Sequence, residues 1–385
     1  MSSFIRPLLL LLLLAGTSLS FAARRARTPD EDPVALAALL VREGQWEKAQ
    51  AVLVGVNPKQ PGIDVVRFHT LTGLVHLHER EGEAAVSAFT AALAAATEGR
   101  ELLELHLARA ELLAGHADRC LSALDRSGTV GAGLTASWLL RAEAHKTLRE
   151  WDLAFEALER GYARLPDQTE LPRTQILFLI ELGLTREARE RAEALISRGS
   201  VTTADVLALS EALRRGGAHL EGQLLLEAAL LQRGDDKDLL VASARAALQA
   251  GQGTSAGRFL ERAAETHPDL YLEAAEAWRR SGDLDNALRV NAYVPDPVTK
   301  ARQRLGLLLE AEAFERAVAL EDRVLRLGLD QEDRVAFGLA YAWFRLGLPS
   351  EAERWLKGIT DPALFARATE LRGAMAACSD EGTCR

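Results

Sequence analysis

The sequence predicts an all-α solenoid of about ten helical hairpins, and two observations on spacing support this fold class. First, ten small residues recur at intervals of 30 to 36 positions: Ala49, Ala85, Cys120, Ala154, Ala188, Gly222, Ala256, Ala287, Ala317 and Ala352. Second, apolar residues follow most of them after four and seven positions, which places all three on one face of a helix. A repeat of this length indicates stacked units that reuse one packing contact.

Each unit is predicted to be a helix, a tight turn and a second helix. A second set of small residues stands twelve positions before the first: Ala37, Gly73, Ala108, Ala142, Ser210, Ala244, Ala275 and Ala340. Glycines between the two sets indicate the turns: Gly44, Gly82, Gly115, Gly183, Gly216, Gly251, Gly282 and Gly347. Small residues at a helix crossing let two backbones approach closely, while larger neighbours fill the grooves.

This pattern resembles the tetratricopeptide repeat (TPR). One unit matches the family's register at Ala142, Ala154, Leu158, Gly161 and Pro166. The resemblance covers roughly residues 33–361 and implies a right-handed α-solenoid of TPR-like hairpins. Three units depart from the pattern, at Ile176 with Ala192, at Asn291, and at Leu305 with Glu321. We expect irregular packing near Pro295 and Pro297, where the repeat also shortens.

The ends of the chain differ from the repeats. Residues 1–22 combine Arg6, an apolar run from Leu8 to Leu14 and small residues before Ala23, which predicts a secretory signal peptide. Residues 23–32 are expected to form a flexible lead and residues 33–361 the repeat array. Residues 362–385 are expected to form a capping helix, from Pro362 to about Ala377, and a cysteine-containing tail.

The signal peptide predicts export, with the periplasm as the location. The arginines that follow it leave open an uncleaved segment that anchors the protein to the inner membrane: Arg24, Arg25 and Arg27. The formal net charge of −9 argues against a nucleic-acid partner, since such proteins favour a basic surface. Aromatic residues make up only 5% of the chain, so leucine and alanine must supply the core.

The three cysteines have different expected roles. Cys120 takes the small buried position of its repeat and is expected to be a packed thiol. Cys378 and Cys384 lie six residues apart, and in an exported protein such a pair can close a disulfide loop. A metal site there is disfavoured because the tail has no histidine.

No motif predicts catalysis, a cofactor or a metal. The glycine-rich stretches at 128–133 and 251–257 lack the preceding strand and the Lys-Ser/Thr pair of a phosphate loop. His69 and His76 are expected to be partly buried substitutes for aromatic residues, whereas His78 is expected to face the concave side, where it can contact a partner. The plentiful carboxylates leave a glycosidase-type pair open, but nothing marks one. We expect the protein not to be an enzyme.

The resemblance to the TPR family implies a concave groove lined by the first helix of each hairpin. Carried over position by position, it predicts these partner-binding residues: Leu74, Leu77, His78, Arg109, Leu112, Leu113, Lys146, Arg214, Arg215, Arg245, Arg279, Arg280, Tyr341 and Arg345. The groove is predicted to be apolar near residues 70–113 and basic near residues 214–280. An extended or helical protein segment with acidic groups would fit it. In the alternative interpretation, these arginines pair with Glu211 and Glu276 on their own helices.

The sequence therefore favours a non-enzymatic scaffold of the bacterial cell envelope that binds protein segments and no small-molecule cofactor. One alternative is an accessory scaffold of a polysaccharide export machine, which would offer Trp138, Trp343 and Tyr341 to sugars. Another is a helical domain related to cell-wall lytic enzymes, although no segment remains for a catalytic domain.

Overall fold

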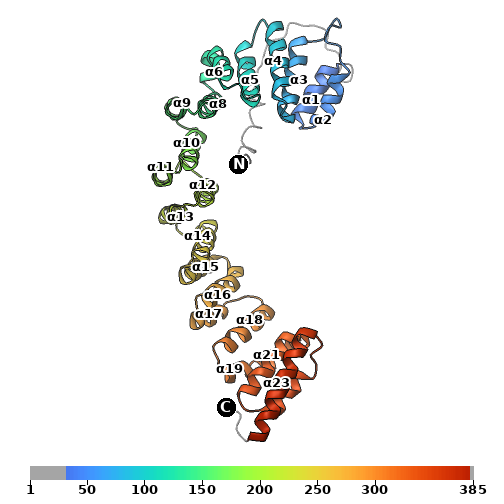
Figure 1. Cartoon of the computed structure of the whole chain (residues 1–385), viewed down its shortest axis with the longest axis vertical. Helices are drawn as coiled ribbons and strands as arrows, with labels where there is room; N and C mark the ends of the chain where they lie inside the picture. Colours follow the sequence, from blue (N-terminus) through green and yellow to red (C-terminus); the bar gives the residue numbers. More distant parts are fainter. Residues whose placement is uncertain (1–31, 382–385) are drawn as a thin grey trace. The chain divides into compact units, whose positions relative to one another are not determined.

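The computed structural model describes residues 32–381, and these residues form helices and no strand. The predicted signal peptide, residues 23–31 of the predicted lead, and Cys384 lie outside the described residues. The chain divides into two compact units, one ending at Phe178 and the other beginning at Leu179. Figure 1 labels most of the helices of the two units in chain order.

The first unit holds four complete hairpins, a short extra helix and most of a fifth first helix. Its helices are α1 (Pro33–Arg42), α2 (Trp46–Val54), α3 (Val65–Glu79), α4 (Gly82–Ala95), α5 (Arg100–Leu113), α6 (Ala117–Arg126), α7 (Gly128–Ala132), α8 (Thr135–Thr147), α9 (Trp151–Arg164) and α10 (Glu170–Glu181). The glycine-rich stretch after residue 127 thus folds as the short helix α7 and the residues that follow it.

The second unit begins within α10 and continues the hairpins to the C-terminal helix. Its helices are α11 (Thr185–Ser197), α12 (Thr203–Arg215), α13 (His219–Arg233), α14 (Lys237–Gln249), α15 (Gly253–Thr266), η1 (Pro268–Leu270), α16 (Tyr271–Arg280), α17 (Leu284–Asn291), α18 (Pro297–Glu310), α19 (Phe314–Val318), α20 (Glu321–Arg326), η2 (Leu329–Gln331), α21 (Asp333–Arg345), α22 (Pro349–Leu356) and α23 (Pro362–Glu381). The described residues of the two units together contain the ten predicted hairpins.

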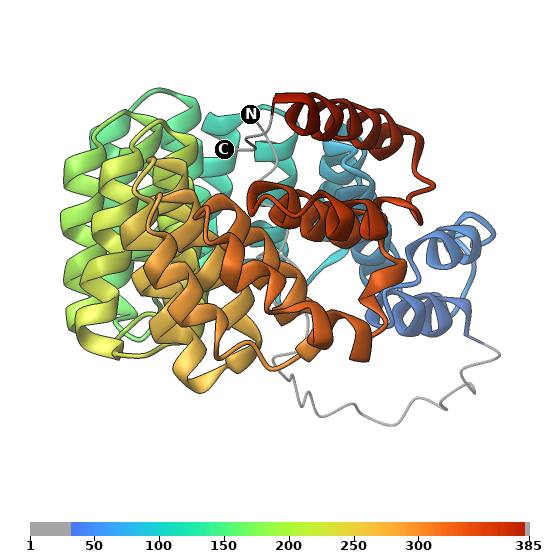
Figure 2. The same cartoon turned by 90° about the horizontal axis from the view of Figure 1, so that it is seen from below.

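Packing within each unit runs from one helix to its neighbours in sequence. The two helices of a hairpin contact each other, and first helices also contact the next hairpin, as α3 does with α5 and α12 with α14. Figure 2 shows α12 to α15 side by side in the second unit. None of the described helices has both the length and the apolar content that a membrane span requires.

The ten repeating small residues lie where the helices of each hairpin cross. All ten are buried, and nine of them, including Ala154 and Ala256, are 0% exposed. At the tenth, Gly222, an added Cβ would come within 2.9 Å of the carbonyl oxygen of Ser210. The crossings are therefore as close as the sequence predicted, and there is no room for a larger side chain there.

The turn between the two helices of each hairpin has one recurring geometry. In all ten hairpins a residue with left-handed backbone dihedrals stands five positions before the small crossing residue. It is glycine in seven turns, because glycine adopts positive φ without a Cβ clash. The other three turns use Arg80, Arg149 and Glu312, with φ of 65°, 61° and 51°. The prediction that Gly82 and Gly216 are the turn residues is therefore wrong. The positive φ lies two residues earlier in the first case, at Arg80, and one residue later in the second, at Gly217.

Proline and aspartate fix several helix starts. Asp32 accepts hydrogen bonds from the backbone N–H groups of Val34 and Ala35, and Pro33 opens α1. Asp296 accepts from the N–H of Thr299 at the start of α18, which Pro297 opens. These caps satisfy N–H groups that have no partner inside a helix.

The second unit is irregular in its ninth hairpin, which begins at Pro297, one of the two prolines near which irregular packing was expected. The second helix of the ninth hairpin is broken into α19 and α20, and Glu321 begins the second piece. Asn291, which departs from the repeat, is fully buried at the end of α17. Its side-chain amide donates to the backbone oxygen of Lys300 at 3.1 Å, which ties α17 to α18.

The C-terminal helix α23 covers the last hairpin. Leu364, Ala368, Leu371 and Met375 are buried, and α23 packs on α21 and α22. Phe365 does not belong to this buried face, because its side chain is 55% exposed. The buried residues of α23 are those at positions 364, 368, 371 and 375, which share one face of the helix. Position 365 is rotated away from this face towards solvent.

Candidate partner-binding surface

The prediction of an apolar groove surface in the first unit is wrong for Leu74 and Leu77. Leu74 and Leu77 are 8% and 6% exposed, and both belong to the core shared by α3, α4 and α5. Leu112 and Leu113 are partly buried against the same core. These four leucines fill the space between successive hairpins of the first unit, so they stabilise the fold and offer little surface to a partner.

The polar residues predicted beside them have contacts within the first unit. The exposed ring of His78 stacks on Trp46, with 4.5 Å between ring centroids. The amine of Lys146 lies 4.6 Å above the ring of Phe178. Arg109 is partly buried, and this burial lowers its pKa.

The predicted groove arginines of the second unit form what we call the arginine ridge: Arg214, Arg215, Arg245, Arg279, Arg280 and Arg345. Most of the positive charge of this ridge is neutralised by carboxylates. Arg214 and Arg215 lie 3.8 Å and 2.8 Å from carboxylate oxygens of Glu211. Arg279 and Arg280 donate to Glu276 at 2.8 Å and 3.0 Å. The alternative interpretation, pairing on the same helix, is therefore confirmed for these four arginines.

A carboxylate shared by two guanidinium groups keeps its charge. Hydrogen bonding to Arg279 is the main cause that lowers the pKa of Glu276, and Arg280 contributes further. In return, the pKa of Arg279 is raised, chiefly by Glu276 and then by Glu310. Both groups remain ionised at neutral pH, so this cluster presents little net charge.

Two other ridge residues differ from these pairs. Arg245 is exposed on α14 and has no ion pair within residues 32–381. Arg345 donates to the hydroxyl of Tyr341 at 2.8 Å, and its guanidinium lies 4.5 Å above the ring of Phe314. Tyr341 is thus held by the chain itself.

A hollow of about 400 Å³ lies in the second unit on the face formed by first helices. Its lining comes from α14, α15, α16 and α18: Leu248, Leu260, Leu272, Glu273, Glu276, Ala277, Arg280 and Gln303. Arg280 is one of the predicted groove residues, and Leu248 and Glu276 lie on the first helices α14 and α16, which the resemblance places along the groove. The structure therefore brings groove positions of successive hairpins to one site.

Sequence reasoning missed Leu272 and Gln303 at this hollow. Leu272 lies one helical turn before Glu276, so the four-residue helical spacing was a usable signal. Gln303 comes from the irregular region, where the repeat shortens. Its side-chain amide donates to the carbonyl oxygen of Leu272 at 2.9 Å and so links α18 to α16.

The chemistry of this hollow suits a side chain of another protein. Leu248, Leu260 and Leu272 supply apolar walls, while Glu276 and Arg280 place both signs of charge at its side. Such a site accepts an apolar group and orients it through polar contacts at the edge. The pKa of Glu276 is lowered by its hydrogen bonds to Arg279 and Arg280, so its carboxylate stays charged beside the hollow.

Each hairpin has a buried small residue at its crossing and a left-handed turn five positions earlier, and within each unit successive hairpins contact one another. The chain folds as a TPR-like array of helical hairpins. No protein-family model matches the sequence, and no curated protein matches it.

Several solved structures are similar at low identity. A tetratricopeptide repeat protein from Parabacteroides merdae has 14% identity and a TM-score of 0.35, over 64% of this chain and all of that one. PilW, a type IV pilus biogenesis factor, has 16% identity and a TM-score of 0.29, over 55% of this chain and all of PilW. A human IFIT1 dimer with m7Gppp-AAAA has 15% identity and a TM-score of 0.30, over 91% of this chain and 92% of that one.

The buried thiol of Cys120 has the packing role expected of it. Cys120 is 0% exposed, and burial is the main cause that raises its pKa to about 12. A thiol that stays protonated is a poor nucleophile and a poor metal ligand. The proposed pair of Cys378 and Cys384 lies outside the described side chains and stays a prediction.

His76 lies among carboxylates but has a structural explanation. Ligand atoms of His76, Glu79 and Glu81 lie within 4.8 Å of one another. His76 Nδ1 is 2.7 Å from Oε2 of Glu81, and His145 makes the same contact with Glu150 in a later hairpin. Because the same contact recurs at an equivalent turn of another hairpin, we attribute it to stabilisation of the turn.

Proposed function

We propose that this chain is a non-enzymatic scaffold that binds segments of other proteins in the bacterial cell envelope. The observation that supports the binding role is the 400 Å³ hollow on the first-helix face of the second unit. It combines apolar walls with a charged edge, as segment-binding sites do. Rigid hairpins would hold this site open, so that a partner loses less entropy on binding.

The neutralised ridge changes the expected partner. Since Arg214, Arg215, Arg279 and Arg280 already have carboxylate partners, an acidic segment gains little from them. The hollow instead favours a segment that inserts one apolar side chain beside Glu276 and Arg280. We therefore propose an amphipathic partner segment and place its apolar anchor between α14, α16 and α18.

Site-specific photo-crosslinking tests this proposal. A photoreactive residue is placed at Leu272 in the hollow and, as a control, at Leu231 on α13, which is 90% exposed. In envelope fractions we expect a defined protein adduct from position 272 and none from position 231. Equal adducts from both positions, or none at 272, would contradict the proposal.

We also propose export to the periplasm, supported by the composition of residues 1–22. N-terminal sequencing of the protein recovered from cells tests it. A start near Ala23 is expected, whereas a start at Met1 or Ser2 would favour the membrane anchor.

The polysaccharide-export alternative has less support. The indole of Trp138 donates to the carbonyl oxygen of Ala132, and that of Trp343 donates to Glu321. Tyr341 is engaged by Arg345 and Phe314. Because these aromatic residues are used within the fold, stacking on sugars is a weaker proposal than binding of a protein segment.

A further inference from the structure

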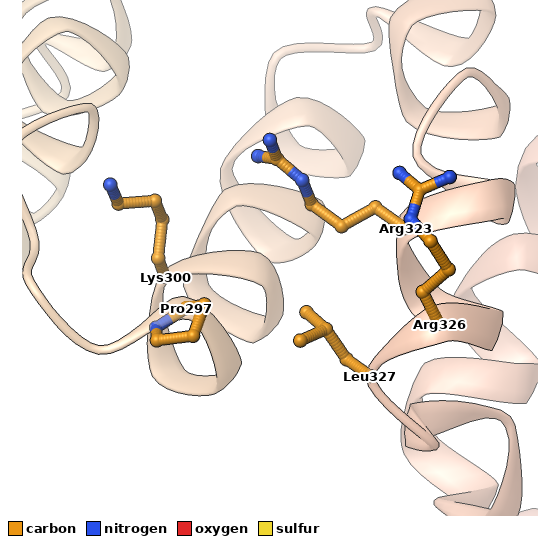
Figure 3. A pocket seen from close by; sticks show the side chains of 5 residues that line it. All are labelled: Pro297, Lys300, Arg323, Arg326 and Leu327. Carbon is orange, nitrogen blue, oxygen red and sulfur yellow. The ribbon is translucent and has the colours of Figure 1, made fainter.

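A second hollow, of about 280 Å³, lies in the second unit at the start of α18. Figure 3 shows its five lining residues: Pro297, Lys300, Arg323, Arg326 and Leu327. Lys300 comes from α18, whereas Arg323 reaches from α20 across the hollow towards it. Three cationic side chains from two helices thus surround one space.

These cations have no carboxylate partners among residues 32–381. The amine of Lys300 donates only to the carbonyl oxygen of Ala292, at 2.9 Å. Arg323 and Arg326 are exposed and take part in no ion pair in the same span. Nearby Arg302, in contrast, lies 2.6 Å from Glu332. An uncompensated positive site is therefore present in a chain whose formal net charge is −9.

The fold holds further positive charge next to this hollow. Arg304, one turn after Lys300, donates to Asn291 Oδ1 at 3.3 Å. Its pKa is lowered, first by burial and then by the charges of Arg316 and Arg323. These guanidinium groups are thus close enough to repel one another, and folding places them together without an anion to offset them.

The position of Lys300 is also fixed from inside the unit. Asn291 is fully buried, and its amide donates to the backbone oxygen of Lys300 and to Gln303 Oε1, both at 3.1 Å. A buried amide with satisfied hydrogen bonds is a rigid support. The backbone of Lys300 in the first turn of α18 is therefore held in place beside the hollow.

We propose that this hollow binds the phosphate group of a phosphate monoester. Guanidinium and ammonium groups are the usual partners of phosphate, and a phosphate dianion offsets more of this charge than one carboxylate does. Pro297 and Leu327 supply apolar contacts for the group that carries the phosphate. The volume, at the small end for ligand sites, fits a small metabolite or a lipid headgroup. This site is separate from the hollow of the proposed function.

Titration calorimetry on the full chain tests the proposal with inorganic phosphate, pyrophosphate and citrate as probes. The variant R323Q/R326Q removes two lining cations. The control R198Q/R258Q removes two exposed arginines, at the C-terminal end of α11 and on α15, that have no ion pair within the described span. We expect phosphate and pyrophosphate to bind, with an affinity at least about tenfold weaker in R323Q/R326Q and unchanged in the control.

Vesicle sedimentation distinguishes the two possible ligands, a lipid headgroup and a soluble phosphate ester. Binding to phosphatidylcholine vesicles that contain phosphatidic acid, lost in R323Q/R326Q, would assign a lipid headgroup; phosphate binding without vesicle binding would assign a soluble ester. No binding of either phosphate probe at millimolar concentration would overturn the proposal. Equal losses in both double variants, or citrate bound as tightly as pyrophosphate, would also overturn it. Circular dichroism confirms that each variant folds.

Discussion

His145 Nδ1 lies 2.8 Å from Oε2 of Glu150, and this contact spans Arg149, the left-handed residue of its turn. His76 and Glu81 span Arg80 in the same way, at 2.7 Å. At the turn between these two, around Gly115, the roles are exchanged, because Glu111 precedes and His116 follows at 2.8 Å. A histidine–glutamate bridge thus closes three successive turns of the first unit.

Removal of one bridge should loosen the first unit. We expect His145→Ala to lower the free energy of unfolding by about 0.5–1 kcal/mol, since a partly exposed hydrogen bond to a charged group is lost. Urea denaturation of the single and double variants of His145 and Glu150 measures the coupling. Additive effects of the two substitutions would show that the bridge contributes nothing.

Replacement of a strained turn residue should stabilise the protein. Glu312 has a φ of 51°, a conformation that glycine adopts without a Cβ clash. We expect Glu312→Gly to raise the free energy of unfolding by about 1 kcal/mol. The matched control is Gly347→Ala at the equivalent position of the next turn, which also has a positive φ. It should lower stability by a similar amount, and a change of the same sign in both variants would refute this account.

Enlargement of a crossing residue should disrupt a hairpin. Ala154 is 0% exposed between α8 and α9, so Ala154→Leu is expected to cost about 1–3 kcal/mol through overpacking. Ala94 is exposed on α4, and Ala94→Leu should change stability by less than about 0.5 kcal/mol. Thermal and urea unfolding of both variants measure the change in the free energy of unfolding. An unchanged stability of Ala154→Leu would mean that the helices cross less closely at this position than the structure shows.

His106 should make the first unit sensitive to acid. It stacks on Phe89, and burial, with a smaller effect of Arg109, lowers its pKa to about 4. Between pH 6.5 and 4 the unfolded chain binds a proton that the folded chain does not, so stability falls as pH falls through this window. The full shift corresponds to about 3 kcal/mol.

The variant His106→Gln isolates this effect because glutamine does not titrate. The loss of unfolding free energy on going from neutral pH to a pH just above the lowered pKa should be smaller in the variant than in the natural protein. Carboxylates titrate in both proteins, so the difference between the two slopes is the measurement. Identical slopes would show that folding does not lower the pKa of His106.

The spacing of small residues was sufficient to predict the fold. A close crossing demands Ala, Gly or a small thiol at one position, so the ten small residues from Ala49 to Ala352 locate all ten hairpins by their spacing alone. The turn residues were harder to predict than the crossings, because three of them adopt a positive φ that residues with a Cβ disfavour: Arg80, Arg149 and Glu312. At these turns the packing of the hairpin overrides the backbone preference of the residue.

The binding surface was less predictable than the fold. Helical periodicity assigns both Leu77 and Arg280 to the groove but does not show that one is buried and the other exposed. The difference depends on how tightly neighbouring hairpins pack, which no single repeat encodes. The hollow near Lys300 was missed for a related reason, since it arises where the second helix of the ninth hairpin is broken.

The constant five-residue step from turn to crossing has a consequence for the modularity of the array. Intervals between crossings vary from 30 to 36 residues, yet this step is the same in every hairpin. The differences in repeat length therefore fall outside the segment from turn to crossing. A hairpin excised or duplicated at its outer connections should keep its register, so the array can change length by whole hairpins.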